Sequence, residues 1–93
     1  MALNELKNIL LWIKASGKSY YLVITQNIAR VLGIKRGDIL EIYFENHGLA
    51  LIDIVKSAKD IRILIPRHYV EYLRIRRGAI VQVTVRVLER VSK

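Results

Sequence analysis

The sequence contains one pattern twice, as ITQNIARVLGIKRGDILEI from Ile24 to Ile42 and as IPRHYVEYLRIRRGAIVQV from Ile65 to Val83. The offset between the two copies is 41 residues (65 − 24), and within these stretches it needs no gap. Several apolar, Arg and Gly positions hold the same residue in both copies. An internal repeat of this kind predicts a fold built from two equivalent units.

Each copy predicts the end of a strand, a short helix, a turn and a new strand. Thr25 is a favourable N-cap residue, and Pro66 suits a first helical turn, where no amide donor is needed. Gly33 stands where a left-handed residue would end the first helix. Arg74 takes that place in the second copy, at a strain of roughly 1 kcal/mol. A further glycine in each copy closes a turn before an alternating apolar run, which predicts a strand.

Alternating apolar runs outside the repeated stretches predict the other strands. We expect six strands, over residues 8–15, 20–25, 39–45, 49–56, 61–65 and 80–88. Residues 1–7 are expected to form a loose or helical lead-in, and the tail 89–93 is expected to fray. Two short polar stretches predict hairpin turns, Ser-Gly-Lys-Ser at 16–19 and Asn-His-Gly at 46–48. The offset predicts an equivalent turn at 57–60.

The offset also predicts which side chains of the first and fourth strands face the core. It aligns two alternating apolar sets, Ile9, Leu11 and Ile13 with Ala50, Ile52 and Ile54. Leu10 and Trp12 would then point to the other face of the sheet. Such residues form either a second core layer, which is the more frequent arrangement, or an exposed surface for a partner.

The repeated pattern resembles the AbrB/SpoVT (MazE-like) swapped-hairpin family, in which a strand ending in Ile-Pro is followed by a short helix, Leu-Gly-Ile-x-x-Gly-Asp and a second strand. The corresponding stretches here are IARVLGIKRGD and IRILIPRHYVEYLRIRRGA, and the resemblance extends from about Ile9 to about Arg86. It implies a mainly β fold, a small AbrB-like swapped-hairpin or cradle-loop β-barrel with two short helices and internal pseudo-twofold symmetry. Residues 1–93 would form a single domain, with copies at about 8–48 and 49–89.

The chain departs from the family pattern in both copies. The first copy replaces a usual Pro, a basic residue and an Arg, and has in their places Thr25, Gln26 and Tyr21. The second copy retains these three family residues as Pro66, Arg67 and Arg62. It instead replaces the helix-ending Gly, the Asp after the turn and a helix Arg, with Arg74, Ala79 and Glu71.

Composition restricts the class of partner. The 93 residues are 53% hydrophobic, enough for a core, and they carry a formal net charge of +8. So basic a small chain predicts an anionic partner, although Lys and Arg can also serve only to keep a strand-rich surface soluble. The lack of cysteine, of a visible signal peptide and of a long apolar run predicts a cytoplasmic protein that does not span a membrane. The absence of Cys and low Gln content fit a thermophile's composition.

The potentially catalytic residues do not predict an enzyme, a metal site or a cofactor. His47 and His68 have no second His or Cys at ligand spacing. The carboxylates are scattered over turns and outer strand faces, where surface roles are commoner than catalysis. No Ser has the setting of an activated nucleophile, and no Gly-rich nucleotide loop is present.

Basic residues recur at equivalent places in the two copies. Lys18 and Lys59 match under the offset, and Arg67 begins the second helix. In the family that the chain resembles, the Arg after the hairpin turn and an Arg on the helix contact DNA, and Arg62 and Arg30 match these positions. We therefore expect a transcriptional regulator that binds double-stranded DNA through these five residues, with phosphate contacts dominating.

The sequence leaves several points open. Lys35, Arg36, Arg76 and Arg77 fill turns and either add to the interface or lie on the far side of the barrel. An antitoxin or another protein-interaction module is the alternative function, although the tail 89–93 is neither long nor acidic, as the family's antitoxin tails are. One chain either closes the barrel alone or swaps halves with a second, and open strand edges predict a homo-oligomer, such as a dimer.

Overall fold

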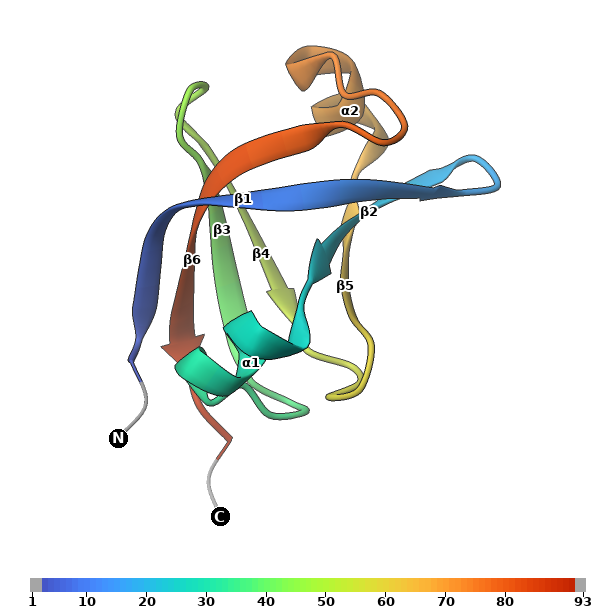
Figure 1. The fold of residues 1–93 in the computed structure, drawn as a ribbon. Coiled ribbons are helices and arrows are strands. Elements are labelled where there is room, and N and C mark those ends of the chain that lie inside the picture. Colours follow the sequence, from blue (N-terminus) through green and yellow to red (C-terminus); the bar gives the residue numbers. More distant parts are fainter. Residues whose placement is uncertain (1–2, 92–93) are drawn as a thin grey trace.

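The computed structural model describes residues 3–91, which form six β-strands and two short α-helices (Figure 1). The strands are β1 (Glu5–Ser16), β2 (Ser19–Ile24), β3 (Ile39–Phe44), β4 (Leu49–Ile54), β5 (Ile61–Ile65) and β6 (Ile80–Glu89), and the helices are α1 (Gln26–Leu32) and α2 (Arg67–Leu73). All strand pairs are antiparallel, in the order β4-β3-β6-β1-β2-β5. The sheet curls into a nearly closed barrel, which confirms the predicted mainly β class.

Four strand pairs join the first copy to the second, namely β1–β6, β3–β4, β2–β5 and β3–β6. The last two pairs show the symmetry of the repeat. In the β2–β5 pair Leu22 lies opposite Ile63, and in the β3–β6 pair Tyr43 lies opposite Thr84. In each of these pairs the two opposite residues are 41 positions apart (63 − 22 and 84 − 43), which is the repeat offset. Exchanging the two copies therefore turns each strand pair into itself. The pseudo-twofold axis expected from the repeat therefore passes through these two ladders.

The helix ends follow from residues that the sequence singled out. The hydroxyl of Thr25 accepts a hydrogen bond from the amide of Ile28 at 3.3 Å, as an N-cap does. Gly33 and Arg74 both end their helices in the left-handed conformation, at φ 61° and 53°. Pro66 occupies the N-cap itself, one position before the first turn where it was predicted.

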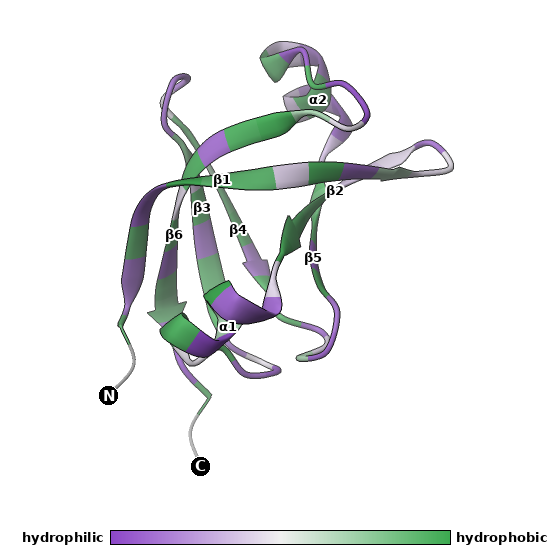
Figure 2. Ribbon diagram, in the orientation of Figure 1, coloured by the Kyte–Doolittle hydropathy of each residue, from purple (hydrophilic) through white to green (hydrophobic). Residues whose placement is uncertain are grey.

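Alternate residues of the strands fill the barrel interior, as the sequence pattern predicts for β2, β3, β5 and β6. The largest fully buried hydrophobic side chains are Leu11, Leu22, Leu32, Leu40, Ile42, Phe44, Ile63, Val83 and Val85. Each contributes about 1.5–3 kcal/mol by leaving water. Figure 2 shows hydrophobic residues concentrated on the strands and hydrophilic ones on the turns that join them.

β1 begins earlier than the sequence predicts. The expected lead-in is wrong for residues 5–7, which belong to β1, while residues 1 and 2 lie outside the described part of the chain. Glu5 and Leu6 find partners because β6 continues to Arg86 and beyond, opposite them. Asn8, at φ 54°, marks a bulge at which the register between β1 and β6 shifts.

The chain after β6 is held rather than frayed as far as Val91. The guanidinium of Arg90 donates hydrogen bonds to the carbonyl oxygens of Gly33 and Leu3, at 3.1 and 3.0 Å. The amide of Val91 donates to Oδ1 of Asp38 at 2.8 Å. The expected fraying is therefore wrong for residues 89–91, and residues 92–93 lie outside the described range.

The face of β4 that points into the barrel is the opposite of the predicted one. Leu51 is buried and Ile52 exposed, the reverse of what the offset implied. Ile13 and Val55 occupy equivalent places, because each exchanges two backbone hydrogen bonds with a glycine-containing turn. They are 42 residues apart (55 − 13), one more than the repeat offset of 41. The second copy therefore has one residue fewer between this position and Ile61. A shift of one residue exchanges the two faces of a strand, which explains why Leu51 and not Ile52 is buried.

The nearly closed barrel has its gap between β4 and β5. β1 and β2 form a tight hairpin that ends with Ser16 opposite Ser19. β4 and β5 are the equivalents of β1 and β2 in the second copy. They lie at the two ends of the strand order, and within residues 3–91 they do not pair with each other. The turn at 57–60 is therefore not the predicted hairpin. Gly17 takes φ 61° in the first turn, whereas Ala58, which does not favour this conformation, aligns with it under the offset.

The second face of β1 is exposed, so the expected second core layer is wrong. Leu10 and Trp12 are 65% and 59% exposed, while Leu11 and Ile13, which alternate with them, are buried. The helices α1 and α2 cover the ends of the barrel instead of this face (Figure 1).

Asp38 is 1% exposed and joins the turn before β3 to the end of the chain. Its Oδ2 accepts a hydrogen bond from the amide of Lys35, and its Oδ1 accepts one from the amide of Val91, both at 2.8 Å. Asp38→Asn should lower the free energy of unfolding by about 2 kcal/mol, because an amide cannot accept both bonds and carries no charge. Urea denaturation measures the change.

Glu71→Gln is the matched control, because the side chain of Glu71 is 72% exposed. It should stay within about 0.5 kcal/mol of the original chain. Equal stability of the Asp38→Asn and Glu71→Gln variants would contradict the structural role given to Asp38.

Candidate nucleic-acid interface

The outward side chains of β1, β2 and β5 form one surface, here called the β2–β5 wall: Lys14, Tyr21, Val23, Arg62 and Leu64. Each alternates with a buried residue of its strand. The register places Tyr21 between Lys14 and Leu64, and Val23 opposite Arg62. Cationic and apolar side chains therefore lie next to each other on this wall.

One end of the wall is the hairpin–α2 junction, where the β1–β2 turn meets the start of α2. Lys18 and Arg67 line a shared groove of about 480 Å³, together with Ser19, Pro66 and Glu71. The nearest acid to Arg67 is only at the limit of an ion pair, with Nε of Arg67 4.0 Å from Oε2 of Glu71. Both side chains are highly exposed, so this pair is weak and Arg67 is available to another anion.

The other end is the loop–α1 junction, where residues 57–60 meet the start of α1. Nε2 of Gln26 donates hydrogen bonds to the carbonyl oxygens of Lys59, at 2.7 Å, and of Ala58, at 3.3 Å. Gln26 therefore holds the loop that carries Lys59. Under the offset Lys59 corresponds to Lys18, and Gln26 to Arg67, so the two junctions are pseudo-twofold equivalents.

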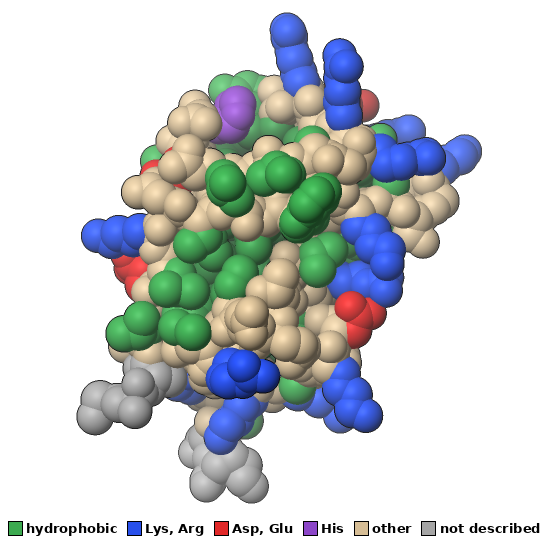
Figure 3. Space-filling model, in the orientation of Figure 1, with side chains coloured by type: hydrophobic (Ala, Val, Ile, Leu, Met, Phe, Trp, Pro, Cys, Tyr) green, Lys and Arg blue, Asp and Glu red, His purple; other side chains and the backbone are tan. Residues whose placement is uncertain are grey.

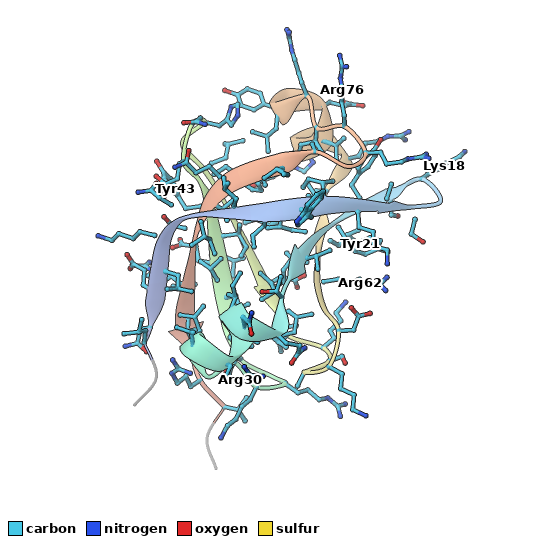
Figure 4. All side chains as sticks on the ribbon, in the orientation of Figure 1. Lys18, Tyr21, Arg30, Tyr43, Arg62 and Arg76 are labelled. Carbon is cyan, nitrogen blue, oxygen red and sulfur yellow. The ribbon has the colours of Figure 1, made fainter. Side chains whose placement is uncertain are left out.

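The remaining two predicted residues lie along the wall and at its lower end. NH2 of Arg62 is 2.8 Å from Oδ2 of Asp60, in a partly exposed ion pair that contributes about 0–1 kcal/mol. Figure 4 shows Lys18 at the hairpin tip, Arg62 below it on the same side, and Arg30 on α1. The structure thus brings Lys18 to Arg67 and Lys59 to the vicinity of Arg62, and it places Arg30 at the opposite end from Lys18. β2 separates the junctions by about 20 Å, at about 3.3 Å for each of its residues.

The basic turns adjoin the same two junctions. The amide of Gly78, in the turn with Arg76 and Arg77, donates to the carbonyl oxygen of Ile13, in the strand that leads to the hairpin tip. The equivalent turn, with Lys35 and Arg36, bonds to Val55 just before the 57–60 loop. These turns therefore belong to the ends of the wall and not to a far side of the barrel.

Sequence reasoning missed Lys14 as a member of this surface. Its signal was its place between the inward residues of β1, but only the register shows that it lies directly opposite Tyr21. Tyr20, on the other face of β2, is partly buried and packs against the core.

Acidic side chains gather mainly away from the wall. The outward residues of β3, β4 and the second half of β6 form the β3–β4 wall, which includes Glu41, Tyr43, Ile52 and Arg86. There NH2 of Arg86 lies 3.0 Å from Oε1 of Glu41, and the charges offset each other. Figure 3 shows Lys and Arg side chains crowded along the right-hand edge, over the β1–β2 hairpin, α2 and β5.

Across residues 3–91, no three His, Asp or Glu side chains stand close enough together to hold a metal ion. Neither helix in this range has the length and apolar character needed to cross a membrane. No protein-family model, curated protein or solved structure matches the chain. Its function is therefore inferred from the charge and geometry of its own residues.

Gln26→Ala should loosen the loop that carries Lys59, because both carbonyl oxygens lose their side-chain donor. We expect backbone order parameters of residues 57–60, measured by ¹⁵N relaxation, to fall toward the flexible range, below about 0.6. Arg67→Ala, at the equivalent position, should leave the tip of the β1–β2 hairpin as ordered as before. An unchanged 57–60 loop in the Gln26→Ala variant would refute the positioning role.

Proposed function

We propose that this chain is a DNA-binding transcriptional regulator of AbrB-like type that lays the β2–β5 wall and its two junctions against a DNA duplex. The observation that supports this most directly is the recurrence of basic residues at both pseudo-twofold equivalent ends of one wall. Lys18 and Arg67 mark one end, and Lys59 marks the other. Lys18 and Lys59 are equivalent under the offset and both remain Lys although many other positions of the two copies differ, which favours a shared role.

The separation of the two junctions suits a duplex. About 20 Å of strand lies between them, which exceeds the width of the major groove, about 12 Å. The two basic ends can therefore reach the phosphates on both sides of a groove at once. Arg and Lys contacts of this kind fix the position of a protein on DNA without reading its sequence.

Arg62 is the candidate for reading base edges. It lies on the wall between the junctions, where its guanidinium forms a partly exposed ion pair with Asp60. A guanidinium can donate two hydrogen bonds to a guanine in the major groove. With so few Arg side chains in the centre of the wall, we expect DNA shape to contribute more to selectivity than a strict base code.

Charge segregation supports a polyanionic partner for this side of the barrel. The chain carries a net charge of +8, and Asp38, one of its eight acids, is buried. Asp60 and Glu71 stand beside Arg side chains at the two junctions. The other acids lie on the β3–β4 wall or near the chain ends: Glu5, Glu41, Glu45, Asp53 and Glu89. The basic side therefore presents a concentrated positive field, which attracts DNA.

The alternative function and the dimer remain predictions. One chain forms the nearly closed barrel, so the fold does not require a second copy to be completed. The edges of β4 and β5 are unpaired in the described residues, and a strand from a partner, including a toxin, would be added there. A tight protein partner recovered in place of DNA would favour the antitoxin function.

Removing the two cations of the hairpin–α2 junction tests the proposal. Binding of the double variant Lys18→Ala/Arg67→Ala to a mixed-sequence duplex should be measured by fluorescence anisotropy from 50 to 200 mM salt, a range that resolves the electrostatic term. We expect at least a 10-fold loss of affinity at the lowest salt. The slope of log K against log salt should fall by about 2, because each lost phosphate contact removes about 0.9 from it.

The matched control is Lys7→Ala/Arg86→Ala, which removes the same charge from ion pairs with Glu5 and Glu41 on the other side of the barrel. This variant should retain the salt slope of the original chain. Equal losses in the two double variants would show that net charge alone attracts DNA, and the proposed interface would be wrong.

A further inference from the structure

An apolar surface with two planar rings lies on and beside the β2–β5 wall. Trp12 is 59% exposed and lies opposite Ile80 of β6, which is 50% exposed. Leu10, two residues earlier on β1, is 65% exposed. Water contacts with this much apolar area are unfavourable, and contiguous patches of this kind usually mark binding surfaces.

The register brings the two rings near each other. Ile13 lies opposite Leu22 and Lys14 opposite Tyr21, so Trp12 is diagonal to Tyr21 on adjacent strands. Diagonal neighbours of a sheet are about 7–8 Å apart. Two rings side by side at that separation can each stack on one of two successive unpaired bases of a strand.

Charge identifies the kind of partner. Lys14 and Arg62 flank the rings, and no outward position described on β2, β5 or the 10–16 part of β1 carries an acid. A second copy of this chain would bring the same cations against each other on a molecule of charge +8. A polyanion with exposed aromatic faces complements both the cations and the rings.

We propose that the surface formed by Trp12, Tyr21, Lys14 and Arg62 binds single-stranded nucleic acid, with unpaired bases stacked on the two rings and phosphates held by the two cations. Duplex DNA cannot stack in this way, because its bases are already stacked and paired inside the helix. This activity does not depend on the duplex-binding function proposed above. Stacking platforms flanked by basic residues bind strands with little sequence preference.

The only tryptophan of the chain is Trp12, so its fluorescence reports on this surface alone. The whole chain should be titrated with oligothymidylate, oligouridylate and a duplex of equal length, while anisotropy of a labelled oligonucleotide measures binding. We expect both single strands to quench the emission with saturation. At equal saturation the duplex should quench it less than either single strand, because paired bases cannot stack on the ring.

Affinity variants provide an independent measurement. Trp12→Leu and Tyr21→Leu keep an apolar side chain but remove the ring, and each should weaken single-strand binding about 10-fold. Tyr43→Leu is the matched control, because Tyr43 is a partly exposed tyrosine on the β3–β4 wall, on the other side of the barrel in Figure 4. It should bind single strands as the original chain does.

Three results would overturn the proposal. The first is single-strand binding, saturated by anisotropy, without a change in Trp12 emission. The second is equal affinity of the Trp12→Leu, Tyr21→Leu and Tyr43→Leu variants. The third is an emission change that depends on protein concentration alone, which would assign the surface to a second copy of the chain.

Discussion

The antiparallel pairing of β2 with β5 joins the two halves of the chain, and the positions of both junctions depend on it. Leu22 and Ile63 meet at its centre, where both side chains are fully buried. A slip of one residue would turn these apolar side chains to solvent and Tyr21 and Arg62 inward, so burial fixes the register strongly. Because each strand runs from a turn to a helix, the pairing necessarily places the turn of one copy beside the helix of the other. The fold thus builds two equivalent basic junctions from one ladder.

The two copies differ mainly in their turns and chain ends, where the buried core does not require equivalent residues. The first hairpin retains Gly17 and closes tightly, whereas the loop at 57–60 has one residue fewer and needs Gln26 to hold it. Asp38 fastens the chain end in the first copy, and the equivalent Ala79 has no carboxylate to do so. The two ends of the wall are therefore alike in position and unlike in chemistry. Under the proposed function, the two ends of the wall would therefore make different contacts with a DNA site.

Much of the fold was predictable from local chemistry. Thr25, Gly33 and the alternating residues of four strands act through their nearest neighbours, and the repeat made the left-handed Arg74 predictable as well. The start of β1 depends on the length of β6, and the facing of β4 on one residue missing far along the chain, so neither is visible locally. For the site, the sequence predicted which side chains are basic, but only the strand register shows that Lys14 lies beside Tyr21 and that Lys18 lies beside Arg67.

Chemical-shift mapping of the ¹⁵N-labelled chain with a short DNA duplex at low salt would test most directly whether the β2–β5 wall and both junctions form one interface. The account predicts that amides at both junctions shift together, including those of Ser19, Lys59 and Arg67. Amides of the β3–β4 wall, such as those of Tyr43 and Ile52, should not move. Shifts confined to the β3–β4 wall, or to one junction alone, would contradict it.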